Sequence, residues 1–238
     1  MTVVARTRTS RQLRADDTRA RLFKAAAQLL LQHGYHGITV EKIAVAAGVA
    51  KGTFFLHFPT KDAVVLELVR LQCGAARQAR AEAMARGDGP IARLQASVLT
   101  LGERAGLSRN VSGAVLSASL QDPRVGDAVN AIFEEVLVEM RQDAAAAAHE
   151  GLFSRHVDPD TVAMQLMAAY LGSVLHFTTT PRAQSLLEVL RPLVDNALAG
   201  AARANVEHDH AKQSARDSGS KPVHDDRPAG GRRLRRRV

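Results

Sequence analysis

Three times in this chain a proline directly follows a residue suited to capping or turning, at Gly89-Pro90, Asp122-Pro123 and Asp158-Pro159. Proline fits the first position of a helix, because that position needs no backbone donor and the ring fixes a helical φ. Apolar residues at helical spacing follow each of these points, and no stretch alternates as a half-buried strand does. The sequence therefore predicts an all-α fold of helices separated by short breaks.

Further start and stop signals divide the rest of the chain. Asp16 or Asp17 can cap a first helix, and Thr39 can cap a second one. Ser185 begins a four-residue capping box ahead of the last helix, in which Pro192 predicts a kink or a split. The expected helices cover about 17–33, 39–47, 50–58, 60–86, 91–103, 112–120, 123–150, 159–177 and 185–200.

The composition narrows the class of protein. Aromatic residues make up only 4% of the chain and tryptophan is absent, which favours close-packed helices over strands. No stretch approaches the roughly 18 apolar residues of a membrane span, and the arginine-containing start lacks the apolar centre of a secretion signal. The single cysteine, Cys73, excludes an internal disulfide and favours core packing over redox sensing. We expect a cytoplasmic protein with no membrane contact, no metal site and no cofactor.

Charge is distributed unevenly along the chain. Residues 1–60 contain nine Lys and Arg against three Asp and Glu, residues 61–200 contain 13 against 16, and residues 201–238 contain ten against five. A basic N-terminal end suits contact with a polyanion while the body serves another role. We predict a flexible basic arm at 1–16, an N-terminal domain at 17–60 that meets the polyanion, a second domain at 61–200 that forms the body, and a disordered basic tail at 201–238.

The segment Thr39–Lys61, TVEKIAVAAGVAKGTFFLHFPTK, bears most directly on function. A helix with one buried face, a tight turn at Gly48 and a second helix of about two turns describe a helix-turn-helix. An α-helix fits the major groove of DNA, so residues near the start of the second helix can reach base edges. The segment resembles the DNA-binding domain of the tetracycline-repressor (TetR) family, and the resemblance extends over residues 17–62.

The resemblance implies a set of DNA-binding residues. Ala50 stands where the family usually has serine, which removes a helix cap or a phosphate donor. Phe55 stands where the family usually has tyrosine, which removes a hydroxyl-to-phosphate bond. Phe54 and Phe58 are alternatively packing anchors, and His57 is either a phosphate ligand or a surface residue. The implied DNA-binding residues are Thr39, Lys51, Gly52, Thr53, Phe54, Phe55, His57 and Lys61, with Thr39 and Lys61 on phosphate.

The resemblance also implies a ligand cavity and a dimer interface in the body. Polar residues near apolar helix faces are the cavity candidates, and each is alternatively an ordinary core or surface residue. An apolar stripe with small members would pack, together with the 186–198 helix, against a second copy or else belong to the internal core. The candidate ligand-binding residues are Arg104, Asn110, His149, Gln165, Tyr170 and His176, and the stripe consists of Met164, Met167, Ala168, Leu171, Gly172 and Leu175.

By resemblance, we expect a transcriptional repressor that binds a palindromic double-stranded DNA operator as a homodimer. An unknown small-molecule effector would favour a second arrangement of the dimer and release DNA by population shift. An enzyme is one alternative, but no phosphate-binding loop, metal-spaced set or nucleophile–base pair supports it. A protein that coats nucleic acid through its basic ends is another, because phosphate neutralisation needs no base sequence. The N-terminal arginines either reach the minor groove or are simply solvated.

Overall fold

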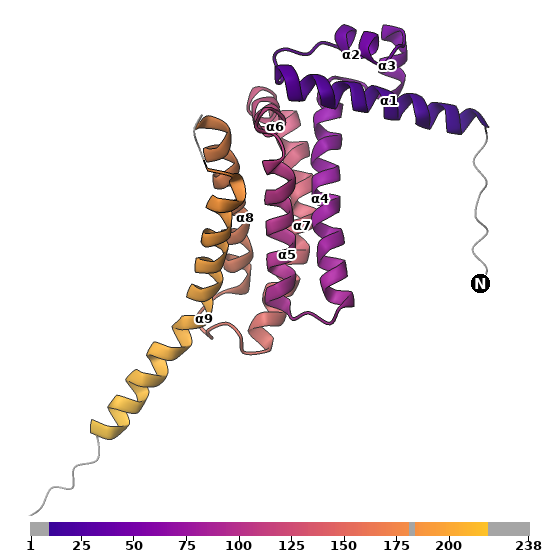
Figure 1. The fold of residues 1–238 in the computed structure, drawn as a ribbon. Coiled ribbons are helices and arrows are strands. Elements are labelled where there is room, and N and C mark those ends of the chain that lie inside the picture. Colours follow the sequence, from indigo (N-terminus) through magenta and orange to yellow (C-terminus); the bar gives the residue numbers. More distant parts are fainter. Residues whose placement is uncertain (1–9, 181–183, 219–238) are drawn as a thin grey trace, which may run out of the picture.

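A computed structural model of the chain describes residues 10–180 and 184–218, with residues 203–218 described by their backbone alone. These residues form helices and no strand, which confirms the predicted all-α fold. Figure 1 shows α1–α3 lying across one end of a bundle made by the longer helices. The helices are α1 (Ser10–His33), α2 (Val40–Ala46), α3 (Lys51–His57), α4 (Asp62–Ala85), α5 (Pro90–Gly106), α6 (Arg109–Gln121), α7 (Pro123–His149), α8 (Pro159–Thr179) and α9 (Leu186–Ser218).

Most of the predicted capping residues start their helices as expected, whereas Asp16 and Asp17 do not. Thr39 Oγ1 accepts a hydrogen bond from the backbone N of Lys42 at 3.3 Å, at the start of α2. Ahead of α9, the backbone N of Ser185 donates to the Glu188 carboxylate at 2.8 Å, and the backbone N of Glu188 donates to Ser185 Oγ at 3.3 Å. This reciprocal pair confirms the capping box. The three prolines that follow capping or turning residues each open a helix, namely α5, α7 and α8.

Helix α1 is longer than predicted. It begins at Ser10 rather than at Asp16 or Asp17, so the expected flexible arm is wrong for residues 10–16. The first two turns are exposed and extend the part of α1 that buries Leu22. Adding residues to an existing helix is favourable for good helix formers even without tertiary contacts, and this explains the extension. The remainder of the expected arm, residues 1–9, lies outside the described residues.

Helix α9 also exceeds its predicted length. It continues to Ser218, so the expected disordered tail is wrong for 201–218. Pro192 lies inside α9 and does not split it. The proline is exposed, so water can satisfy the carbonyl that loses its backbone donor there. Residues 219–238, including the terminal arginine run, lie outside the described residues.

Two phenylalanine rings form the centre of the small domain made by α1–α3. The ring centroids of Phe54 and Phe58 lie 5.7 Å apart, and both side chains are buried with Leu22 in the same apolar cluster. Arg19 of α1 forms a 3.0 Å ion pair with Glu67 of α4, which links the small domain to the body. The buried rings therefore hold the helices of the small domain together, and the Arg19–Glu67 ion pair fixes the domain to α4.

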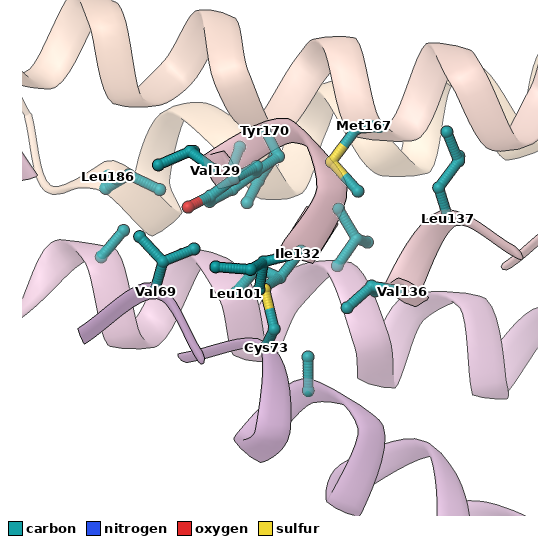
Figure 2. Packing of buried hydrophobic residues seen from close by; sticks show 14 of the residues in the cluster. Val69, Cys73, Leu101, Val129, Ile132, Val136, Leu137, Met167, Tyr170 and Leu186 are labelled. Atoms are coloured by element: carbon teal, nitrogen blue, oxygen red, sulfur yellow. The ribbon is translucent and has the colours of Figure 1, made fainter. Parts of the chain in front are cut away.

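The core of the body lies between α4, α5, α7 and α8. Figure 2 shows Cys73, Leu101, Ile132 and Tyr170 gathered between these helices. Burial raises the pKa of the Cys73 thiol to about 12, so the thiol stays protonated and packs as a small apolar side chain. These contacts favour the packing interpretation of Cys73 over a redox role.

A buried ion cluster holds α4, α5 and α7 together away from the small domain. Asp143 of α7 is 2% exposed, and its carboxylate accepts hydrogen bonds from Arg80 Nε at 2.6 Å and Arg93 Nε at 2.8 Å. Arg80 also lies 3.7 Å from the Glu139 carboxylate. Separating these helices would leave a charge unpaired in a poorly solvated site, which is costly. We therefore interpret the ion cluster as holding this end of α4 in place.

Candidate nucleic-acid interface and ligand cavity

A tight turn at Gly48 joins α2 and α3. Gly48 has a φ of +65°, a left-handed conformation that glycine adopts without the steric cost other residues carry. The turn brings together Ile43 of α2 and Phe54 of α3, which are both 0% exposed and belong to one apolar cluster. Because these inner faces are occupied, each helix turns its opposite face to solvent. The geometry is that of a helix-turn-helix.

The predicted DNA-binding residues fall into three groups by exposure. Phe54 is fully buried, so the prediction that it contacts DNA is wrong and it is a packing anchor. The helical period explains this, because Phe54 lies on the face of α3 that the turn directs inward. Phe55 is 47% exposed and lies outside the core. Of the other predicted residues, three are exposed, namely Thr39, Lys51 and Gly52, and three are half-buried, namely Thr53, His57 and Lys61.

Lys51 opens α3 and pairs with Glu41 of α2. The hydrogen bond from Lys51 is the main cause that lowers the pKa of the Glu41 carboxyl to about 2. Both side chains are more than half exposed, so water or a phosphate can replace Glu41 at little cost. Ala50 provides no side-chain cap for α3, as its departure from the family pattern implies.

Lys61 lies at the N-cap of α4, beside Tyr35. Its ammonium nitrogen is 3.9 Å from the centroid of the Tyr35 ring, a cation–π contact. The Tyr35 hydroxyl donates to the Asp62 carboxylate, and burial followed by this hydrogen bond raises the pKa of the Tyr35 phenol. The predicted phosphate-binding residue thus also ties the chain after α1 to the start of α4.

Leu56 is an exposed residue that the sequence reasoning missed. Its side chain is 83% exposed on α3, the largest value among the large apolar side chains that the structure describes as exposed. Val45 on α2 is 79% exposed. The signal was available in the helical period, because Leu56 stands two residues beyond the inward-facing Phe54.

A cavity of about 890 Å³ lies between α4, α6, α7 and α8 and reaches α1. This volume is within the usual range for small-molecule sites. The part of α1 that borders the cavity consists of Ala27 and Leu31, so the cavity touches the small domain directly. Most of the lining is apolar, and its larger members include Leu68, Leu71, Val111, Val115, Phe133 and Val174.

A few polar groups interrupt the apolar lining. Gln72 donates to the Tyr170 hydroxyl and, at 2.9 Å, to the backbone carbonyl of Leu101. Burial is the main cause that raises the pKa of the Tyr170 phenol, so this group stays neutral. Arg104 is exposed at the cavity, and no hydrogen bond or ion pair joins it to another residue in the described ranges. A cation without a partner beside an apolar cavity suits a ligand with one anionic group.

Two of the six predicted ligand-binding residues, Arg104 and Tyr170, line the cavity. The prediction is wrong for the other four with respect to this cavity. Asn110 turns away from it, and its Nδ2 donates to the backbone carbonyl of Leu31 at 2.6 Å. The remaining three lie on exposed helix faces and are His149, Gln165 and His176. Gln72 and Asn130 line the cavity and were missed, because nothing in their local sequence marks them.

Comparison with known proteins identifies the helix-turn-helix. The family of bacterial regulatory proteins, tetR family, matches residues 22–68. The transcriptional regulator EthR from Mycolicibacterium smegmatis is 36% identical over 74 residues, which is 29% of this chain and 34% of EthR. The chain thus covers about a third of the length of that relative. The transcriptional regulator TcmR from Streptomyces glaucescens is 30% identical over 197 residues, 79% of this chain and 84% of TcmR.

The chain belongs to the tetR family. Its fold agrees with that of FadR from Bacillus subtilis, a transcriptional regulator solved in complex with stearoyl-CoA. The two share 18% identity with a TM-score of 0.65, over 76% of this chain and 98% of FadR. These relatives are transcriptional regulators, so the tetR assignment favours regulation over the alternative of an enzyme.

The apolar stripe of this tetR-family chain lies mostly outside the core. Met164, Leu171 and Leu175 on α8 are 47–50% exposed, and Leu193 on α9 is 44% exposed. Met167 differs, because it is 5% exposed and packs in the core of its own chain. The exposed part of the stripe also borders the cavity, because Leu171, Gly172 and Leu175 are among the residues that line it.

No described helix combines the length and apolar character that crossing a membrane requires. No three His, Cys, Asp or Glu side chains among the described residues lie together as metal ligands would.

Proposed function

We propose that the chain is a cytoplasmic transcriptional repressor that binds a palindromic operator as a homodimer and leaves it when a small molecule enters the cavity. The observation that carries the proposal is the outward face of α3, presented by a helix-turn-helix whose inner face is fully packed. Lys51 and the basic residues of 1–60 supply the positive charge that phosphate contact needs.

The exposed stripe on α8 and α9 supports a two-fold dimer. An apolar strip of this kind is costly to leave in water, and a second copy would cover it with the same residues. Dimerisation would also place two α3 helices about one DNA turn apart, as reading two half-sites of a palindrome requires. The stripe therefore serves DNA reading indirectly.

The cavity supports an elongated apolar ligand with one anionic group. Apolar side chains from six helices, α1 and α4–α8, would surround the body of the ligand, and Arg104 would pair with its charge. The fold neighbour FadR was solved with stearoyl-CoA, which joins an elongated apolar acyl chain to a coenzyme A part that carries phosphate charges. We infer that a fatty acyl compound is the first ligand class to examine.

The position of the cavity supports coupling to DNA. Ala27 and Leu31 of α1 form part of its wall, and Asn110 of α6 holds the Leu31 carbonyl. A ligand that changes the spacing of α1, α4 and α6 would move the small domain, whereas the ion cluster at Asp143 holds the other end of α4. Release follows if the ligand prefers the arrangement that cannot bind the operator.

Selection of bound duplexes from random DNA by the full chain, at physiological salt, tests the proposal. We expect an enriched palindrome that is protected in footprinting and lost in a Lys51→Ala/Thr53→Ala variant that still folds. Binding that fades with salt and enriches no sequence would contradict it and favour the alternative of a coating protein. Deletion of 219–238, which removes the terminal arginine run and leaves α9 whole, separates the two further, because a repressor keeps its sequence preference and a coating protein loses most binding.

A second experiment tests the proposed ligand, with stearoyl-CoA as the probe and free coenzyme A as its control. We expect stearoyl-CoA to raise the melting temperature and to release the selected duplex, and Arg104→Ala to weaken both effects. Arg124→Ala is the matched control, since Arg124 is a 91% exposed arginine that does not line the cavity. Release that is equal in both variants would exclude Arg104 as the ligand's partner.

A further inference from the structure

The outward face of α3 is centred on Gly52 and Leu56. With 3.6 residues per turn, positions two before and two after Phe54 each point about 160° away from it. Phe54 is the fully buried residue of α3, so Gly52 and Leu56 mark the side opposite the core. They are also four residues apart, which places them next to each other on that side.

No contact among residues 10–180 and 184–218 explains either residue. Leu56 is 83% exposed and does not belong to the apolar cluster that packs the rest of the chain. A Cβ added at Gly52 would meet no atom within 4 Å, so no contact inside the chain requires glycine there. A glycine inside a helix is unfavourable relative to alanine, and close approach of another molecule is a physical reason for it.

The positive charge next to this surface indicates that the approaching molecule is a polyanion. Lys51 precedes Gly52 at the start of α3, so a cation lies at the edge of this apolar surface. Phosphate contacts of this kind position a helix in the major groove without reading sequence. A leucine has no hydrogen-bond donor or acceptor in its side chain, and thymine is the base that presents a methyl group in the major groove.

We propose that Leu56 reads a thymine C5-methyl group, with Gly52 allowing α3 to approach the base edges closely enough for that contact. The inference rests on the proposed function, because it takes the operator of that function as its substrate. It makes Leu56 a specificity-determining residue, whereas Lys51 supplies affinity that depends less on sequence.

Replacement of thymine by deoxyuridine tests the proposal, since it removes the methyl group and keeps every hydrogen-bonding group. Each thymine of the selected duplex is replaced in turn, and affinity for the full chain is measured at fixed salt. At one position in each half-site we expect about fourfold weaker binding per methyl removed, the value for one buried methyl-sized group. Leu56→Ala should weaken binding to the thymine duplex by a similar factor and be insensitive to the replacement.

Leu120→Ala is the matched control, because Leu120 is a 75% exposed leucine on α6, outside the small domain. It should keep both the affinity and the sensitivity to deoxyuridine, and melting temperatures of both variants show that they fold. If no position responds to deoxyuridine, or if Leu56→Ala keeps the response, the inference is wrong while the repressor proposal stands. If no duplex is enriched at all, the repressor proposal fails and this inference fails with it. If Leu56→Ala dissociates the dimer, Leu56 belongs to a protein interface and the inference is wrong.

Discussion

The small domain of α1–α3 and the body of α4–α9 place their candidate functional residues differently. In the small domain the interior is closed around Phe54 and Phe58, and the candidate DNA-reading residues lie on the outside. In the body the candidate ligand-binding residues line a cavity between helices that also build the core. Stability and function should therefore be separable in the small domain and coupled in the body.

The largest expected effect is at the buried ring of the small domain. Phe54→Ala should lower the free energy of unfolding by about 4 kcal/mol, because it removes a fully buried aromatic side chain and leaves a cavity. Phe55→Ala should cost less than about 1 kcal/mol, since Phe55 is 47% exposed. Urea unfolding of both variants measures the difference, and similar losses would show that the inner and outer faces of α3 are not distinct.

In the body, Asp143→Ala should lower stability by about 3 kcal/mol, because Arg80 and Arg93 lose a buried partner. The loss is smaller than the cost of a fully unpaired charge, since Glu139 lies near enough to take Arg80. Glu135→Ala is the control, because Glu135 is a 61% exposed partner of Arg77 and should cost less than about 1 kcal/mol. Equal effects of the two changes in urea unfolding would argue against a fixed end of α4.

A smaller effect of opposite sign is expected in the cavity. Ala75 lines the cavity, so Ala75→Leu should raise the free energy of unfolding by about 1 kcal/mol and reduce the thermal shift by stearoyl-CoA. Ala85→Leu, at the exposed end of α4, should change neither quantity. A variant at residue 75 that gains stability and keeps the full ligand response would break the expected coupling of stability and function in the body.

The smallest effect concerns the surface pair of Lys51 and Glu41. The pKa of Glu41 is lowered to about 2 in the folded chain, so the pair is intact above the ordinary carboxyl pKa. The contribution of the pair to the stability of the fold is lost as the pH falls toward about 2, where the Glu41 carboxylate takes up a proton. An NMR titration of Glu41 should show this low midpoint in the wild type and a higher one in Lys51→Ala. An unchanged midpoint would mean that Lys51 does not hold Glu41.

The sequence predicted the small domain more closely than the body for a physical reason. Thr39 as a cap, Gly48 as a turn and the spacing up to Lys61 are local features, so short-range rules reach them. The exception was Phe54. The resemblance to the family predicted that it contacts DNA, whereas the helical period places its side chain in the core. The extra turns of α1 before Asp16 were missed because they are exposed and carry no burial pattern.

In the body, local rules predicted the starts of α4, α5, α7, α8 and α9 to within two residues. They missed the start of α6 at Arg109, which Ser108 caps, and they failed for the cavity. The cavity depends on how distant helices come together, and the bonded pair of Gln72 and Tyr170 is separated by 98 residues along the chain. Asn110 and His176 were chosen for polarity near apolar faces, but one bonds to α1 and the other is exposed. Short-range patterns do not contain the packing angles that decide which side chains share a cavity.

Gly52→Ala tests most directly the claim that the outer face of α3 reads DNA separately from the fold. The melting temperature of the variant and its affinity for the selected duplex are measured together at one salt concentration. We predict an unchanged or higher melting temperature, because a Cβ there meets no atom within 4 Å, together with about tenfold weaker specific binding. Unchanged affinity for the selected duplex would contradict the claim, as would a loss of affinity that accompanies an equal loss of folding.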